Sequence, residues 1–257
     1  MQDRQPLRIG CVKYLNARPL IHGWPTDVVL DHPATLCAQL ARGELDVALV
    51  SSFEFLRNPI YRIVDGISIS SDGPVYSVVA AHVGKISAVE EIELDPAAET
   101  SGNLLRCLLS ELKLWPRFVA TSMSSLPKGT ARLLIGDQAI RFRQERANEF
   151  QFWDVGEQWK KLVELPFVYA LWLVRPEVVD PKSIADRLRA LRANNLAKID
   201  NLIADEREFD RGFCDRYYRE HLRFSFGERE KQGLRAFHEL CQKHELLPKR
   251  DIAFSVV

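Results

Sequence analysis

Short apolar runs alternate with amphipathic segments along most of the chain. An apolar run bounded by polar or turn residues is typical of a buried strand, whereas apolar residues at every third or fourth position indicate a helix. The order strand, helix, strand recurs, which predicts an α/β protein. Strands are predicted at residues 8–12, 27–30, 46–50, 61–65, 75–81, 92–95, 132–135 and 167–174, and helices at 34–42, 52–56, 101–112, 183–205 and 228–247.

The last predicted strand indicates a chain divided between two lobes. The run 167–174 is continuously apolar and ends before Arg175 and Pro176, so we expect it to return the chain to the first lobe at a hinge. The 257 residues suffice for two lobes around a cleft. We expect residues 1–81 and 174–257 to form the first lobe and residues 82–173 the second, with a ligand cleft between them.

The segment 14–20, with the sequence YLNARPL, follows the first strand directly and resembles a helix start. Asn16 is expected to cap the helix with its side chain, and Pro19 is tolerated within the first turn, where its missing amide hydrogen costs nothing. The free amides of a helix start, together with the charge of Arg18, would attract a carboxylate. The predicted ligand is a small organic acid; an ordinary strand-to-helix turn with a polar cap is the alternative.

Hydroxyl side chains occur at two further predicted helix starts. Ser51 and Ser52 separate a strand from a short helix, while Thr100 and Ser101 precede an amphipathic helix together with Gly102, which permits close approach of a ligand. Both places are candidate anion sites because helix starts present unpaired amides.

Two more polar positions follow or interrupt predicted strands. Gly73 and Pro74 form a turn before Val75, and Ser77 lies just beyond it among apolar residues. The Ser77 hydroxyl is expected either to meet a ligand or to bond a backbone carbonyl. Asp137 ends another strand, where it would orient a ligand hydroxyl, cap a helix or pair with an arginine.

Charge and hydropathy argue against nucleic acids and membranes as partners. Lys plus Arg and Asp plus Glu number 35 each, so no overall positive field favours nucleic acid or anionic lipid. No apolar stretch approaches membrane-spanning length, and the N-terminal residues lack a secretion signal, so we expect no membrane partner and a cytoplasmic location.

Cysteine and histidine spacing argues against disulfides and metal sites. The five cysteines are odd in number and scattered, which predicts reduced core thiols. His238, Cys241 and His244 have a spacing that drifts around a helix, so they do not converge on a metal ion. The chain also lacks a glycine-rich phosphate loop and the GxSxG and HExxH motifs, and we expect neither a metal nor a cofactor.

Several motifs occur together in one order along about the first two thirds of the chain: GxVxYLNARPL at 10–20, GPVxSV at 73–78, LD at 94–95 with TS at 100–101, IGD at 135–137, and Trp159 seven residues before Pro166. This ordered set resembles the chorismate dehydratase family of menaquinone biosynthesis by the futalosine route. The resemblance implies a type II periplasmic-binding-protein-like fold, in which two α/β lobes with mixed sheets are joined by two crossover strands.

The same resemblance implies that chorismate is converted to 3-[(1-carboxyvinyl)oxy]benzoate and water. The family's asparagine falls on Asn16 and its motif serine on Ser77, which become the candidate catalytic residues. With the junctions described above, the candidate substrate-binding residues are Tyr14, Arg18, Ser51, Ser52, Gly73, Pro74, Val75, Thr100, Ser101 and Asp137.

The chain departs from the family at residues 95–100, where the family often has more serine, so ligand contacts on that loop are less defined.

Two other functions stay open at this point. A related 1,4-dihydroxy-6-naphthoate synthase-like enzyme shares the implied fold but has a different N-terminal motif. A non-catalytic organic-acid-binding protein would also use an anion-binding cleft. The sequence predicts no oligomeric state.

Overall fold

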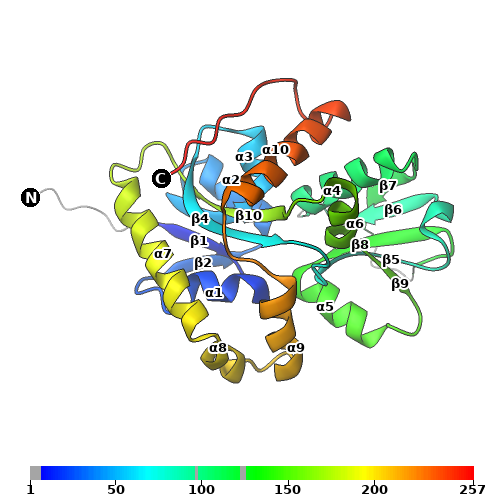
Figure 1. Ribbon diagram of the computed structural model, residues 1–257, viewed down its shortest axis with the longest axis horizontal. Helices are drawn as coiled ribbons and strands as arrows, with labels where there is room; N and C mark the ends of the chain where they lie inside the picture. The colour runs from blue at the N-terminus through cyan, green and yellow to red at the C-terminus, as the bar shows by residue number, and fades with distance from the viewer. Residues whose placement is uncertain (1–6, 96–97, 122–125) are drawn as a thin grey trace, which may run out of the picture.

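The computed structural model describes residues 7–95, 98–121 and 126–257, which form two five-stranded sheets lying side by side (Figure 1). We call the sheet with the N-terminal strand, and the helices on it, the first lobe, and the other sheet with its helices the second lobe. The first sheet has the order β2 (Val28–Asp31), β1 (Ile9–Val12), β3 (Val47–Ser51), β10 (Phe167–Val174), β4 (Arg62–Ser71). The second has the order β7 (Arg117–Ala120), β6 (Glu91–Leu94), β8 (Thr130–Ile135), β5 (Val78–His82), β9 (Gln151–Asp154).

Both sheets share one pairing pattern. In the first, β1 is parallel to β2 and β3, while β10 is antiparallel to β3 and β4. In the second, β6 is parallel to β7 and β8, while β5 is antiparallel to β8 and β9. Parallel neighbours require crossover connections, which the alternation of strands and helices along the chain supplies. The predicted α/β class with mixed sheets is confirmed.

Helices cover both sheets and the junction between them. In the first lobe these are η1 (Leu15–Ala17), α1 (Arg18–Ile21), α2 (Pro33–Ala41), α3 (Ser52–Arg57), α7 (Pro181–Ala197) and α8 (Ile199–Asp205). In the second lobe they are η2 (Ile86–Ala88), α4 (Glu99–Glu111), α5 (Gly136–Glu145) and α6 (Val155–Val163). The helix predicted over 183–205 is divided into α7 and α8 at Lys198, whose ψ of 30° departs from helical geometry.

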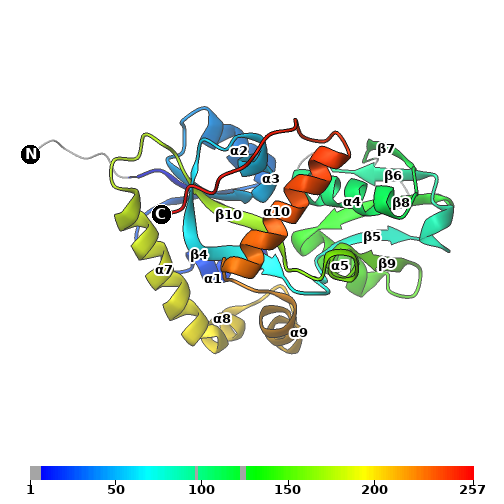
Figure 2. The same ribbon diagram turned by 45° about the horizontal axis from the view of Figure 1, so that its top comes forward.

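The C-terminal segment joins the two lobes. Helix α9 (Arg211–Arg216) continues into a π-helical turn, η3 (Tyr217–His221), and both lie beside α5 at the junction (Figures 1 and 2). Helix α10 (Glu228–Lys243) packs on β10 of the first lobe and on α4 of the second. The lobe boundaries expected from sequence place these C-terminal helices on the first lobe alone, whereas α10 contacts both lobes. Its apolar face covers the junction between the sheets.

The chain crosses between lobes at residues 72–77, after β4, and at residues 164–166, before β10. Among the described residues, β5 pairs with strands of the second sheet and β10 with strands of the first. The expected lobe boundaries at 81/82 and 173/174 therefore fall one strand later than the changes of sheet. Apolar runs mark buried strands but carry no information about hydrogen-bonding partners, so periodicity alone does not locate the crossings.

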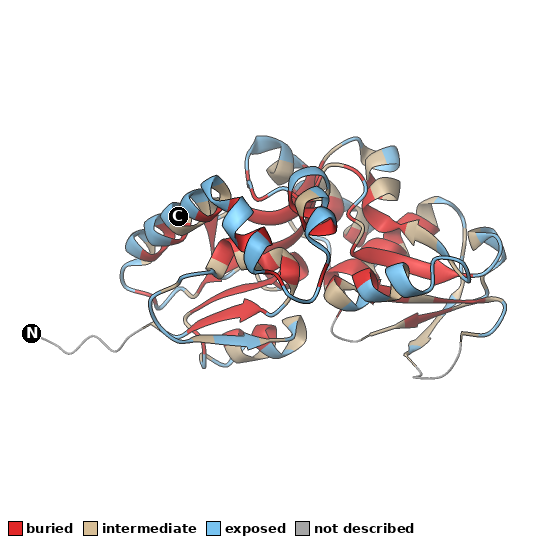
Figure 3. Cartoon of the chain, turned by 90° about the horizontal axis from the view of Figure 1, so that it is seen from below, coloured by how far each residue is buried: buried red, intermediate tan, exposed pale blue. Residues whose placement is uncertain are grey.

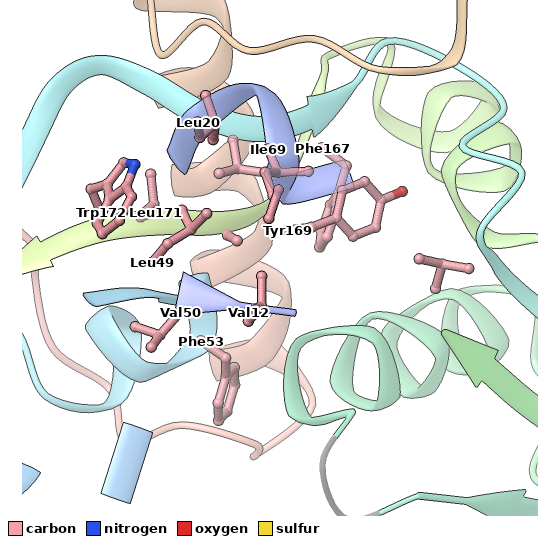
Figure 4. Packing of buried hydrophobic residues seen from close by; sticks show 14 of the residues in the cluster. Val12, Leu20, Leu49, Val50, Phe53, Ile69, Phe167, Tyr169, Leu171 and Trp172 are labelled. Carbon is pink, nitrogen blue, oxygen red and sulfur yellow. The ribbon is translucent and has the colours of Figure 1, made fainter. Parts of the chain in front are cut away.

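A continuous apolar core underlies both lobes. All eight residues of β10 are buried, as the uninterrupted apolar run predicts for a central strand (Figures 3 and 4). The rings of Trp159, Phe167 and Phe237 pack edge to face beneath the junction. All five cysteines are buried and free, which confirms the prediction of reduced core thiols. None of the described helices combines the length and apolar composition needed to cross a bilayer.

Candidate active site

A cavity lies between the two lobes, where the ends of β1, β3, β5, β8 and β10 meet. The cavity volume is about 580 Å³, including the solvent-filled space at its mouth. The candidate residues that line it are Tyr14, Asn16, Ser51, Val75, Ser77, Thr100 and Ser101. The candidate residues outside its lining are Arg18, Ser52, Gly73, Pro74 and Asp137. Segments from both lobes thus contribute to one cavity.

Asn16 reaches the cavity from η1, the single 3-10 turn that follows β1. The expected helix cap is wrong, because the positions preceding η1 and α1 are Tyr14 and Ala17, and neither helix start has a side-chain cap. Asn16 lies inside the turn instead. Its side chain interacts with the Tyr217 phenol and lowers the pKa of that group. Its Oδ1 is buried and has no hydrogen-bond partner among the described residues. Pro19 does occupy the first turn of α1, as predicted.

Ser77 lies at the end of the first crossing, directly before β5, and is fully buried. Its backbone N–H donates to the Val75 carbonyl at 2.8 Å, which closes a three-residue turn around Tyr76. Tyr76 has a φ of 67°, a left-handed conformation that costs energy for a residue with a side chain. The hydroxyl of Tyr217 donates to Ser77 Oγ at 2.6 Å. The unusual backbone expected near Ser77 is therefore present, centred on Tyr76.

Asp154 holds this turn in place. Its carboxylate accepts hydrogen bonds from the backbone N–H groups of Val75 at 3.0 Å and Tyr76 at 2.8 Å. The same carboxylate caps α6 by accepting from Gly156 and Glu157, both at 3.1 Å. Gly73 and Pro74 lie in the preceding part of the crossing, outside the cavity lining, where Gly73 adopts a φ of 134°. Their role in the structure is to shape the crossing.

Thr100 joins the lobes at the start of α4. That helix begins at Glu99, two residues before the predicted start, so its first amides belong to residues that line the cavity. Thr100 Oγ1 hydrogen-bonds the Ser51 hydroxyl and accepts from the N–H of Phe53 at 3.1 Å. The start of α3, a predicted anion site, is thus occupied by a side chain of the other lobe. Ser52 is fully buried and donates to the Val168 carbonyl at 2.7 Å, within the first sheet.

Arg18 and Asp137 make contacts within the protein that the sequence did not reveal. Arg18 forms an ion pair with Glu206, whose side chain is only 1 % exposed. A buried carboxylate requires such a partner, so the guanidinium is committed to Glu206. Asp137 Oδ1 accepts from the N–H of Leu15 at 2.8 Å, which links α5 of the second lobe to η1 of the first. Burial raises the pKa of Asp137, against the effect of the Leu15 hydrogen bond.

Three lining or supporting residues lie beyond the candidates from sequence. Tyr169 on β10 lines the cavity; its hydroxyl lies 3.3 Å from Ser71 Oγ and is directed away from Trp172 (Figure 4). Gly136 lines the cavity with a φ of 59°, and a Cβ there would lie 2.8 Å from the Tyr14 ring. Tyr217 reaches Ser77 from 140 residues away. Only Gly136 had a sequence signal, since a glycine at a strand end often marks a required backbone geometry.

The cavity has no basic side chain in its described lining, although an organic acid is its predicted ligand. Its described lining contains no lysine, arginine or histidine. The titratable lining groups are Glu99, which pairs with Arg57 at 2.6 Å, and the phenols of Tyr14 and Tyr169. Burial raises the pKa of Tyr14 to about 12 and that of Tyr169 well above its usual value, so both phenols stay protonated near neutral pH. No group of side chains in the described part of the chain has the composition of a metal site.

The paired five-stranded sheets, the two crossings and the cavity between lobes define a type II periplasmic-binding-protein-like α/β fold. Solved structures agree: an Archaeoglobus fulgidus protein superposes with a TM-score of 0.71 at 20% identity, covering 94% of this chain and 98% of its own. A Candida albicans protein described as having the generic periplasmic binding protein fold gives 0.63 at 10% identity, covering 96% and 92%. The aliphatic sulphonate binding protein SsuA of Escherichia coli gives 0.60 at 12% identity, covering 95% and 94%.

The chain belongs to the menaquinone biosynthesis family, which it matches over residues 7–243. It is also 28% identical to the chorismate dehydratase of Thermus thermophilus, across 91% of this chain and 95% of that one. These matches confirm the family resemblance and the fold class that the ordered motifs predict. The final third of the chain, which carries few recognisable motifs, falls within the matched range as far as residue 243.

Proposed function

We propose that this protein is a chorismate dehydratase, which converts chorismate to 3-[(1-carboxyvinyl)oxy]benzoate and water. The relationship to the Thermus thermophilus enzyme supports this reaction. The observation that carries it is the arrangement of Asn16 and Ser77, which line one cavity and contact the same Tyr217 hydroxyl. The reaction breaks the C3–H and C4–O bonds of the substrate ring and forms a C3–C4 π bond. Aromatisation supplies most of its driving force.

Asn16 and Ser77 suit the two requirements of the departing hydroxyl. Chorismate as a dianion has one hydrogen-bond donor, its C4 hydroxyl, and the unpartnered Oδ1 of Asn16 is an acceptor that matches it. As the C4–O bond breaks, its oxygen gains negative charge and needs a donor. Ser77, whose oxygen already accepts from Tyr217, is able to donate its own proton there. The pair would hold the leaving group and stabilise its charge.

The start of α4 suits the carboxylates of the substrate. Its first backbone amides and the hydroxyls of Thr100 and Ser101 belong to the cavity wall and provide neutral donors. The positive end of a helix favours an anion without any side-chain charge. We therefore assign carboxylate binding to α4 in place of Arg18, which pairs with Glu206.

The proton acceptor is best supplied by a carboxylate of the substrate itself. Among the described lining groups, the phenols of Tyr14 and Tyr169 are held protonated by burial, and Glu99 is engaged by Arg57. A substrate carboxylate held close to C3 reacts intramolecularly, where fixed geometry replaces the need for a strong base. The protein's contribution is then to bind one conformer, exclude water and stabilise the departing hydroxyl.

Incubation of the purified protein with chorismate tests this function. The expected product is 18 Da lighter than chorismate and aromatic in its ultraviolet absorbance, and it is identified by mass spectrometry against authentic 3-[(1-carboxyvinyl)oxy]benzoate. Asn16→Ala and Ser77→Ala should each lower kcat about 10²- to 10³-fold, the range found when one preorganised donor is removed. The matched controls Asn201→Ala and Ser255→Ala alter exposed positions and should retain full activity.

Three results would contradict the proposal in different ways. Binding of chorismate by calorimetry without turnover would favour an organic-acid-binding protein. No binding and no turnover, with formation of 1,4-dihydroxy-6-naphthoate from its own pathway precursor, would favour the naphthoate synthase-like alternative. Full activity in both alanine variants would separate the reaction from this cavity.

A further inference from the structure

We propose that Tyr217 is a positioning residue that fixes the direction in which Ser77 donates its proton. This inference rests on the proposed function and deepens it. Tyr217 is fully buried, and its hydroxyl donates to Ser77 Oγ at 2.6 Å. Neither the family match nor the ordered motifs point to Tyr217, which lies in a π-helical turn close to the C-terminal end of the matched range.

The hydrogen bond from Tyr217 determines what Ser77 can do. A serine hydroxyl has one proton and two acceptor lone pairs. Because Tyr217 donates to Ser77 Oγ, the Ser77 proton must be directed elsewhere, and no described group accepts it. Ser77 lines the cavity, so its proton is available to a ligand there. Without Tyr217, the hydroxyl would rotate freely and would spend part of its time as an acceptor.

Tyr217 is itself held from several sides. Its ring stacks on Phe213 with centroids 5.4 Å apart and planes inclined by 16°. The Asn16 side chain interacts with the phenol and lowers its pKa, while the hydroxyl donates to Ser77. The neighbouring Tyr218 donates to the Leu15 carbonyl at 3.0 Å and so ties η3 to the turn that carries Asn16. The hydrogen bond that Ser77 Oγ accepts from Tyr217 polarises the serine O–H and strengthens it as a donor.

Burial keeps the Tyr217 phenol in its donor form. Desolvation raises the pKa of Tyr217, and the interactions with Ser77 and Asn16 offset only part of that rise. A deprotonated phenolate would reverse the direction of the bond and turn the Ser77 proton away from the substrate. Tyr217 therefore remains the donor and Ser77 Oγ the acceptor of this hydrogen bond across the neutral pH range.

Kinetics of Tyr217→Phe, Ser77→Ala and the double variant test the inference. Tyr217→Phe should lower kcat by about 10- to 100-fold and change KM by less than about threefold, since it removes orientation without removing a ligand contact. In the Ser77→Ala background, Tyr217→Phe should lower kcat by less than about twofold, because the group it orients is gone. Tyr61→Phe is the matched control: it removes another buried hydroxyl, 3.4 Å from Glu54, outside the cavity lining, and should leave kcat unchanged.

A second variant guards against a folding defect. 3-Fluorotyrosine at position 217 keeps the ring and the hydroxyl and should hold kcat within about threefold of the wild type. The inference would be overturned if Tyr217→Phe had the same kcat as the wild type. It would also be overturned if Tyr217→Phe lowered kcat by the same factor in the wild type and in Ser77→Ala. A 3-fluorotyrosine protein as slow as the phenylalanine variant would also overturn it. If the wild type leaves chorismate unchanged, the proposed function fails first and the inference fails with it.

Discussion

Asp137 accepts a hydrogen bond of 2.8 Å from the backbone N–H of Leu15, so the first turn of α5 in the second lobe is tied to the turn that carries Asn16 in the first. Thr100 makes a comparable link from α4 to the start of α3. Both links are hydrogen bonds between one lobe and the other. Asp137 and Thr100, the side chains that make these links, are both candidate ligand contacts on the basis of the sequence.

The Asp137 link predicts a pH-dependent stability difference. Burial raises the pKa of the Asp137 carboxyl in the folded protein above 3.8. The folded state therefore favours the protonated carboxyl. As the pH rises from the pKa of this carboxyl in the unfolded chain to its higher pKa in the folded protein, the wild type loses stability. Asp137→Asn keeps an acceptor for Leu15 without the buried charge. Measured by differential scanning calorimetry, the Tm of Asp137→Asn should exceed that of the wild type at pH 7 and equal it at pH 3. A lower Tm for the variant at pH 7 would contradict this account.

The Thr100 link predicts that its hydroxyl supports stability across the lobes. Thr100→Val keeps the shape of the side chain but removes the acceptor of the Phe53 N–H and the partner of Ser51. The loss should lower the free energy of unfolding by about 1–2 kcal/mol, the usual range for a lost helix cap. Urea denaturation measures it. Thr100→Ser retains the hydroxyl and serves as the control; a Thr100→Val protein as stable as the wild type would contradict a stabilising role for the hydroxyl.

Gly136 predicts a specific effect on Tyr14. Gly136→Ala places a Cβ 2.8 Å from the Tyr14 ring and also strains a left-handed backbone with φ of 59°. Gly84→Ala has comparable backbone strain at φ of 79° but meets no atom within 4 Å. The strain alone should cost about 1–2 kcal/mol in each variant. Only Gly136→Ala should also weaken chorismate binding, measured by calorimetry, because it displaces Tyr14 from the cavity wall. Equal affinities in the two variants would show that Tyr14 is unimportant for binding.

The pairing of Arg18 predicts a structural role for this residue. Arg18→Met leaves the buried Glu206 carboxylate without its counter-charge. The expected loss is about 2–3 kcal/mol, below the figure for a fully buried pair because the Arg18 side chain is 38% exposed. Arg18→Met with Glu206→Gln should recover much of that loss in urea denaturation. The value of kcat/KM should stay within about threefold of the wild type. A far larger loss of kcat/KM in the stable double variant would restore Arg18 as a substrate contact.

Much of the fold follows from local patterns. The strand at 167–174 is continuously apolar because β10 is covered on both faces, and the alternation of strands and helices reflects parallel pairing with crossovers. The short helix before Pro59 and the helix that ends near Gly43 also have local signals, since proline and glycine limit the available backbone conformations. Such features depend on neighbours in sequence, which is why they are visible without coordinates.

What the sequence determined by itself is the class of fold, the family and a set of polar positions that includes Asn16, Ser77 and Thr100. Only the tertiary structure decided the roles of those positions. Arg18 meets Glu206 from 188 residues away, and Tyr217 meets Ser77 across 140 residues. The crossings also lie one strand earlier than the apolar pattern suggests. Hydrogen-bond and ion-pair partners are chosen by distance in space, and that distance exists only after two sheets and a C-terminal helix have packed together.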